Sequence, residues 1–183
     1  IIGEKDACGV GFIANVEGME SNWILKQSLK GLNCMEHRGG CGGDSDSGDG
    51  AGILCSIPWG YLDEELNLIN KQKLDRGLGM VFMPNKKEKI EECKSICEEE
   101  AEKLSFKETS WRKVPVNNEI LGPLAKANVP YICQWILYID TKDKQNIERL
   151  LFQLRKRIEK KIRETFKNDV CLLYTSPSPR DIR

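Results

Sequence analysis

Two stretches of this chain are almost wholly apolar, and they give the clearest structural signal in the sequence. Residues 78–83 and 131–139 contain hardly any charged side chains, which is typical of strands buried on both faces. Shorter runs in which apolar and other residues alternate with a period of two predict further strands. These further strands are expected over residues 8–15, 52–57 and 105–116.

Apolar residues that recur every three or four positions predict helices between these strands. The predicted helices cover residues 21–36, 59–69, 86–104 and 142–166. Ser21 or Asn22 is suited to cap the first helix, and one face of that helix is expected to pack down. Residues 117–130 are expected to be irregular, with a turn at Gly122 and Pro123. Alternating helices and strands, with strands too apolar to face water, predict a layered α+β protein.

The balance of charge argues against two classes of partner. The chain has 183 residues with 28 basic and 28 acidic side chains, so its neutral surface gives no reason to expect binding to nucleic acid or to an anionic membrane. The basic side chains of helix 142–166 are mixed with acidic ones, which indicates a solvated face. No run reaches the roughly 18 apolar residues that a membrane span needs. We therefore expect an intracellular domain, cytoplasmic or in a plastid.

The eight cysteines are scattered through a chain with many aliphatic residues, which favours buried packing positions over a disulfide framework for most of them. Cys93 and Cys97 are one helical turn apart and lack the two-residue gap of common zinc pairs. His37 is the only histidine that could join them. No metal site is expected from this set.

Residues 37–52 contain seven glycines and are too glycine-rich for a helix and too polar for a core strand, so they predict a loop. The loop follows the end of helix 21–36. Backbone amides freed by so much glycine can turn inward around a small polar ligand.

Cys8 begins the first predicted strand and is followed by Gly9, with a second glycine at Gly11. Glycine destabilises a strand, so its presence here argues for the close approach of a ligand or of another backbone segment. Taken without its context, Cys8 would be interpreted as a buried strand cysteine with no chemical role.

The context is a set of motifs that resembles a known family. Three runs occur in order, DACGVGFIAN, MEHRGGCGGDSDSGDGAGIL and LGMVFMP. They resemble the type 2 glutamine amidotransferase domain at the front of the glutamate synthase large chain, from about residue 6 to residue 170. The resemblance implies the four-layer αββα sandwich of N-terminal nucleophile hydrolases, truncated at its C-terminal end. It also implies that Cys8 is the catalytic nucleophile and the first residue of the mature protein.

A terminal cysteine can act as nucleophile and base together. A free thiol has a pKa near about 8.5 and a free α-amine near about 8, so at neutral pH the amine can accept the thiol proton. Residues 1–7 are therefore expected to be the remnant of a propeptide, with the amidotransferase domain over residues 8–171.

By the same resemblance, Arg38, Gly39 and Gly9 are candidates for shaping the site or contacting the substrate. For Arg38 the alternative is that it only holds the loop through hydrogen bonds to carbonyl groups. His37 lies 29 residues after Cys8, unlike the far longer interval of papain-type enzymes, and it is interpreted as capping its helix end.

The resemblance implies the hydrolysis of L-glutamine to glutamate and ammonia, which passes within the protein to downstream synthase domains and aminates 2-oxoglutarate. FMN, an iron-sulfur cluster and NAD(P)H or ferredoxin are implied for those domains. No cofactor is expected in these 183 residues, which lack the phosphate-binding glycine pattern of a dinucleotide site. Two alternatives stay open: another type 2 amidotransferase, such as a purine or amino-sugar synthesising one, or a non-catalytic binding domain of the same fold.

The last residues depart from the family pattern. Residues 172–183 have two prolines and no hydrophobic period, and they resemble a translated cloning tail or a disordered terminus. The family's oxyanion-hole and glutamine-anchoring residues would lie beyond this point. Because one oxyanion donor lowers a barrier by about 3 kcal/mol, the 183-residue chain alone is expected to be inactive.

Overall fold

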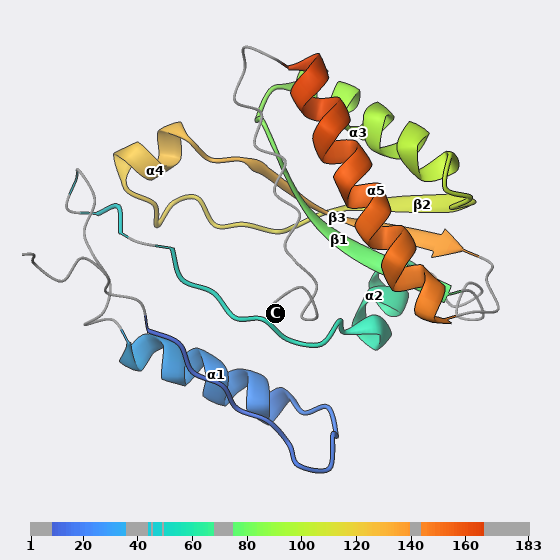
Figure 1. The fold of residues 1–183 in the computed structure, drawn as a ribbon. Helices are drawn as coiled ribbons and strands as arrows, with labels where there is room; N and C mark the ends of the chain where they lie inside the picture. The colour runs from blue at the N-terminus through green and yellow to red at the C-terminus, as the bar shows by residue number, and fades with distance from the viewer. Residues whose placement is uncertain are drawn as a thin grey trace, which may run out of the picture. The chain divides into compact units, whose positions relative to one another are not determined.

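The most apolar stretch of the sequence forms the centre of a three-stranded antiparallel sheet (Figure 1). The structure is a computed structural model, and it describes residues 9–35, 44, 46–48, 50–67, 75–139 and 144–166. Strand β3 (Tyr131–Ile139) pairs with β1 (Asp75–Met83) and with β2 (Glu108–Lys113). The strands predicted over residues 78–83, 105–116 and 131–139 are thereby confirmed, with β2 shorter at both ends than expected.

One face of the sheet is covered by two helices, α3 (Lys87–Glu102) and α5 (Lys144–Thr165), as Figure 1 shows. Both helices were expected from their apolar stripes, which are buried against the sheet. The Trp111 and Trp135 rings stack with centroids 5.0 Å apart. The buried core on this face includes Val81, Met83, Ile90, Cys93, Ile96, Cys97, Cys133, Trp135, Leu137, Ile147, Leu154, Ile158 and Ile162.

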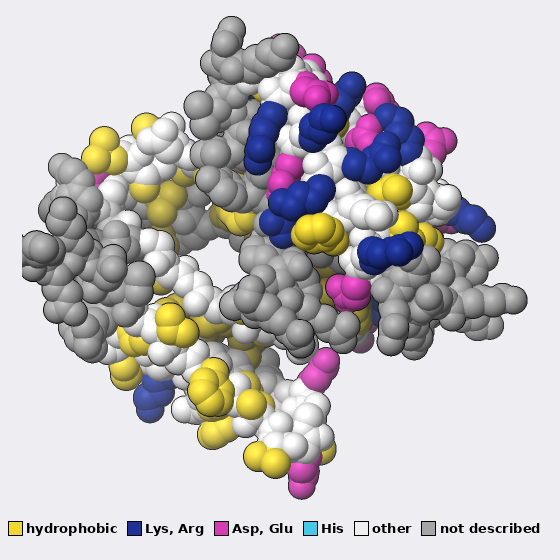
Figure 2. Space-filling view, in the orientation of Figure 1, with side chains coloured by type: hydrophobic (Ala, Val, Ile, Leu, Met, Phe, Trp, Pro, Cys, Tyr) yellow, Lys and Arg dark blue, Asp and Glu magenta, His cyan; other side chains and the backbone are white. Residues whose placement is uncertain are grey.

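The outer face of α5 is solvated, as the mixed charges predict. Figure 2 shows Lys and Arg side chains gathered over this helix with acidic side chains among them. Two of the cations, Arg155 and Lys156, contact Glu159 on the same helix at 2.9 and 3.1 Å.

Among the described residues, the short helix α2 (Trp59–Glu65) covers part of the opposite face of the sheet. Ile136 and Tyr138 of β3 are buried there. The predicted burial on both faces therefore holds for β3, whereas β1 alternates between buried and half-buried side chains. The helix expected over residues 59–69 ends early, at Glu65 within the described part.

Polar contacts fix α2 on the sheet. Arg76 of β1 forms a bidentate ion pair with Asp63 of α2, and its guanidinium lies 4.1 Å from the centre of the Trp59 ring. Arg112 of β2 donates hydrogen bonds to the Tyr61 hydroxyl at 3.0 Å and to Glu65 at 3.2 Å. Two arginine side chains of the sheet therefore hold α2 against this face.

The chain divides into two units. The sheet with α2, α3 and α5 belongs to the unit formed by residues 57–116 and 129–183. The other unit consists of residues 1–56 and 117–128 and contains α1 (Asn22–Cys34) and the short α4 (Pro123–Ala127). The protein therefore has mixed helix and sheet, as expected for an α+β fold.

Helix α1 forms where the sequence predicts it. The Ser21 hydroxyl accepts a hydrogen bond from the Trp23 amide at 3.2 Å, which confirms the predicted cap. The expectation that one face packs down is wrong for the described residues, because no side chain of α1 is buried. Yellow apolar side chains are accordingly visible over this unit in Figure 2.

Two predicted strands are absent. Residues 9–15 and 52–57 lie in coil or turn, and Val10 and Phe12 are 95% and 98% exposed. Alternation fixes which side a residue would face, but a strand forms only when a neighbour takes up its backbone hydrogen bonds. No strand among the described residues pairs with either segment.

Residues 117–130 were expected to be irregular and instead include α4. Gly122 precedes this helix as its cap residue, and Pro123 is its first residue. Proline suits this position because its fixed φ matches the helix and its missing N–H would have no partner inside the helix. The Gly122–Pro123 turn of the sequence analysis is therefore a helix start.

Candidate active-site segments

The segment that carries the predicted nucleophile enters the described structure one residue after it. Cys8 lies outside the described residues, and Gly9 is exposed in a coil. A Cβ atom placed on Gly11 would have no neighbour within 4 Å. Close approach by another backbone segment is therefore wrong at Gly11 within the described part of the chain, whereas close approach by a ligand stays a prediction.

A tight turn follows this coil and leads into α1. The Asn15 side chain accepts a hydrogen bond from the Glu17 amide at 2.7 Å, and the Asn15 carbonyl accepts one from the Gly18 amide at 3.1 Å. Gly18 has φ of +72°, a left-handed conformation that glycine adopts without a Cβ clash. The turn connects the segment after Cys8 to the cap of α1.

Helix α1 connects the two predicted site segments along the chain. It ends at Cys34, four residues before Arg38. Arg38, Gly39 and His37 lie outside the described residues, so their predicted roles stay predictions.

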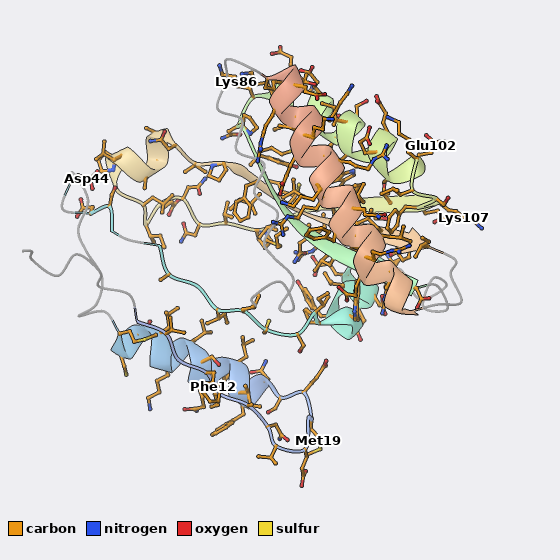
Figure 3. The ribbon with its side chains drawn as sticks, in the orientation of Figure 1. Phe12, Met19, Asp44, Lys86, Glu102 and Lys107 are labelled. Atoms are coloured by element: carbon orange, nitrogen blue, oxygen red, sulfur yellow. The ribbon has the colours of Figure 1, made fainter. Side chains whose placement is uncertain are left out.

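The described residues of the glycine-rich segment 37–52, namely 44, 46–48 and 50, form bends, coil and a single bridge residue, as a loop requires. This loop is attached to α4, and Figure 3 shows Asp44 beside that helix. The Asp44 carboxylate accepts a hydrogen bond from the Leu124 amide at 2.9 Å. The Ser47 hydroxyl accepts one from the Ala125 amide at 3.2 Å.

The hydrogen-bond donors around Asp44 shift the pKa of its carboxyl group. The Leu124 amide, and after it the Ser47 side chain, lower the pKa of Asp44 below its ordinary value. Asp44 is therefore ionised at neutral pH, when its carboxylate can accept every one of these hydrogen bonds.

Sequence reasoning missed Asp44, Ser47 and Gly122 as a connected set. Their contacts join residues 78 and 80 positions apart, and such distances leave no trace in local periodicity. The available signal was the Gly-Pro pair, which often starts a helix whose first amides need acceptors.

The described cysteines differ in exposure. Cys93, Cys97 and Cys133 are buried, as was expected for most of the cysteines, whereas Cys34 and Cys55 are exposed. Burial raises the pKa of the Cys133 thiol to about 11, so this thiol is not a nucleophile at neutral pH. Among the residues described, no group of three or more metal-ligating side chains comes together.

The comparison with protein families agrees with the motif resemblance. Residues 8–182 match the family described as glutamine amidotransferases class-II. The chain belongs to this family. The match starts at Cys8 and includes the coil 9–20, α1, the glycine-rich loop and the sheet. The class-II amidotransferases are enzymes, and the resemblance found in the three motifs is confirmed.

Curated relatives of this class-II amidotransferase chain are glutamate synthases. It is 43% identical over 166 residues to ferredoxin-dependent glutamate synthase 1, chloroplastic/mitochondrial, of Arabidopsis thaliana, covering 88% of this chain and 10% of that protein. It is 41% identical over 170 residues to ferredoxin-dependent glutamate synthase 2 of Synechocystis, covering 91% of this chain and 11% of that protein. The chain thus spans about a tenth of the length of these relatives.

Among the described residues of this amidotransferase chain, no helix is both long enough and apolar enough to cross a bilayer.

Proposed function

We propose that this chain is the part of a glutamate synthase that supplies the nucleophile for the glutaminase half-reaction, in which the full-length enzyme hydrolyses L-glutamine to glutamate and ammonia. The observation that carries the proposal is the family match, which begins at Cys8 itself. The glutamate synthase relatives, at about 40% identity over most of the chain, favour this enzyme over other type 2 amidotransferases.

The chemistry needs Cys8 to be a chain terminus. Its α-amine takes the thiol proton, and the sulfur attacks the side-chain amide carbon of glutamine. The tetrahedral intermediate collapses as the protonated α-amine gives its proton to the amide nitrogen, so the C–N bond breaks and the nitrogen leaves as ammonia. Water then attacks the glutamyl thioester, which releases glutamate and restores the thiol. An amide nitrogen at Cys8 could not serve as this base, so residues 1–7 are proposed to be removed as a propeptide.

Arg38, Gly39 and Gly9 are proposed to shape the glutamine site. A guanidinium can bind the substrate carboxylate through two parallel hydrogen bonds. The glycines would leave room beside the sulfur. The alternative for Arg38, in which it only holds the loop, predicts no direct contact with glutamine.

The finer fold is proposed to be the four-layer αββα sandwich, with the amidotransferase domain over residues 8–171 and a separate tail over residues 172–183. Support comes from the sheet face opposite α3 and α5, of which the described residues cover only a part. On that face Met80, Phe82 and Ile132 are half-buried, and a second sheet packed there would remove their apolar surface from water.

Ammonia released at Cys8 is proposed to aminate 2-oxoglutarate in downstream domains of the same protein. Those domains would hold FMN and an iron-sulfur cluster, with ferredoxin as the reductant that the names of the relatives favour over NAD(P)H. The relative from Arabidopsis is named as chloroplastic/mitochondrial, which supports a plastid over the cytoplasm.

Labelling of the full-length mature enzyme tests the proposal. A diazoketone analogue of glutamine should alkylate Cys8, forming a carbon–sulfur bond with loss of nitrogen gas, and excess glutamine should protect the thiol. Peptide mass spectrometry locates the adduct, and exposed Cys34 and Cys55 serve as internal controls that should stay unmodified. If no adduct forms at Cys8, the alternative of a non-catalytic binding domain is favoured instead.

A further inference from the structure

Helices α3 and α5 carry opposite charge, although the chain as a whole is neutral. Residues 87–102 contain seven acidic and three basic side chains, whereas residues 144–165 contain eight basic and three acidic ones. The two helices lie side by side on one face of the sheet (Figure 1), and the Arg157 guanidinium contacts the buried Glu100 between them at 2.7 Å. The outer surface of this helix layer therefore has an acidic side and a basic side.

Exposed charges of one sign form a row along each helix. Glutamates recur on α3 at spacings of four, seven and three residues, and cations recur on α5 at spacings of seven, four and three. These spacings place each set on the side of its helix opposite the buried apolar stripe. We call the two sets the acidic row and the basic row, and every member is exposed: Glu88, Glu92, Glu99 and Glu102 on α3, and Arg149, Lys156, Lys160 and Arg163 on α5.

Most of these charges are not paired with one another or with other described residues. Within the described part of the chain, no ion pair uses Glu88, Glu92, Glu102, Arg149 or Arg163. Lys156 and Lys160 contact carboxylates of their own helix at 3.1 and 4.0 Å, and such exposed pairs are weak. Both rows can therefore bind charges on a partner.

The order of the charges indicates which partner fits. A surface of a single sign, such as nucleic acid or an anionic membrane, would be attracted by one row and repelled by the other. A surface with both signs side by side in the reverse order is attracted by both rows. A second copy of this helix layer provides that order when it is rotated about an axis that runs between the two helices and along them, because each acidic row then faces a basic row.

We propose that the outer surface of α3 and α5 is a self-complementary interface through which two copies of the full-length protein associate with two-fold symmetry. This inference is independent of the proposed function, because it involves neither Cys8 nor glutamine. The two ends of each row are 14 residues apart, which is about 21 Å of helix, so the rows match in length.

The size of the interface sets its strength. Two helices packed about 10 Å apart form a strip about 20 Å wide, which is small beside the roughly 800 Å² that each partner buries in a standard interface. Exposed charges make up most of the strip. The dimer is therefore weak and forms at micromolar concentrations and low salt.

Sedimentation velocity of the full-length mature enzyme at micromolar concentration measures this association. Raising the salt from about 0.1 M to about 1 M shortens the Debye length from about 10 Å to about 3 Å, so the dissociation constant of the dimer should rise at least about tenfold. Lys156→Glu combined with Lys160→Glu places like charges opposite each other and should raise it at least about a hundredfold. Glu88→Lys combined with Glu92→Lys should have the same effect.

The matched control reverses two charges elsewhere. Lys26 and Lys30 are exposed on α1 at the same spacing as Lys156 and Lys160, so Lys26→Glu combined with Lys30→Glu makes the same change in net charge. This control should leave the dissociation constant unchanged.

Mixing the two interface variants tests whether the partner is a second copy. The changed positions are acidic on α5 in one variant and basic on α3 in the other, so neither variant matches itself but each matches the other. An equimolar mixture should form dimers with a dissociation constant near that of the wild type. Recovery in the mixture would also show that both variants are folded.

Three results would overturn the proposal. The wild type could stay monomeric at about 0.1 M salt, or the α5 variant could associate as tightly as the α1 control. If both interface variants and their mixture are monomeric, the surface contacts another domain or another protein instead of a second copy. None of these results bears on the labelling of Cys8, so the proposed function is tested separately.

Discussion

Replacing Cys8 with alanine should reduce glutamine-dependent glutamate synthesis by the full-length enzyme at least about a thousandfold, because loss of a covalent nucleophile removes the thioester route entirely. Synthesis from added ammonia should persist, since this reaction does not use the thiol. The measurement is the initial rate of glutamate formation from 2-oxoglutarate with glutamine or with ammonium as the nitrogen donor.

Two controls accompany this prediction. Cys55→Ala removes another exposed thiol and should leave both rates unchanged. Cys8→Ser keeps a weaker nucleophile beside the same amine and should be severely impaired with glutamine. A Cys8→Ala enzyme that still uses glutamine at the wild-type rate would show that another group attacks the substrate.

Replacing Asp63 with alanine should destabilise the sheet unit by about 3–5 kcal/mol, the usual effect of removing one partner from a buried ion pair. The Asp63 side chain is only 5% exposed, and that of Arg76 only 15%. Without Asp63, the Arg76 guanidinium would stay buried with its charge uncompensated. The free energy of unfolding is measured by urea titration of the purified chain, followed by tryptophan fluorescence.

The neighbouring residue provides the matched control. Glu64 is exposed on the same helix, so Glu64→Ala should change the free energy of unfolding by no more than about 0.5 kcal/mol. The double variant Asp63→Ala with Arg76→Met should recover much of the loss, because it leaves no unpaired charge. Equal effects of the Asp63 and Glu64 variants would show that the ion pair does not hold α2.

The sheet unit could be predicted from the sequence because its signals are local. β3 is apolar at nearly every position, and it is the central strand, with neighbours on both edges and a buried side chain at each position from Trp135 to Ile139. The apolar stripe of α5 likewise predicts which face of this helix is buried, although the sequence does not show what the helix packs against. Burial on both faces was overestimated for β1 because the sequence of a strand does not show how far a helix such as α2 extends over it.

The segments near the candidate site were harder to predict because their structure depends on distant partners. Residues 9–14 alternate like a strand, yet alternation cannot supply the neighbour that a strand needs. The contacts of Asp44 and Ser47 join a loop to the first turn of α4, and neither segment carries a periodic pattern. Cys8 was identified from the family's motifs. The alternating pattern of the sequence that follows it would alone have favoured a packing role.

The central claim is that one residue provides both the attacking sulfur and the amine that activates it. The most direct measurement is the intact mass and N-terminal sequence of enzyme purified from its native host, made on the same sample that is assayed for glutamine-dependent activity. The account predicts a chain that begins with Cys8 and carries a free α-amine. Fully active enzyme that retains residues 1–7, or that is blocked at Cys8, would contradict it.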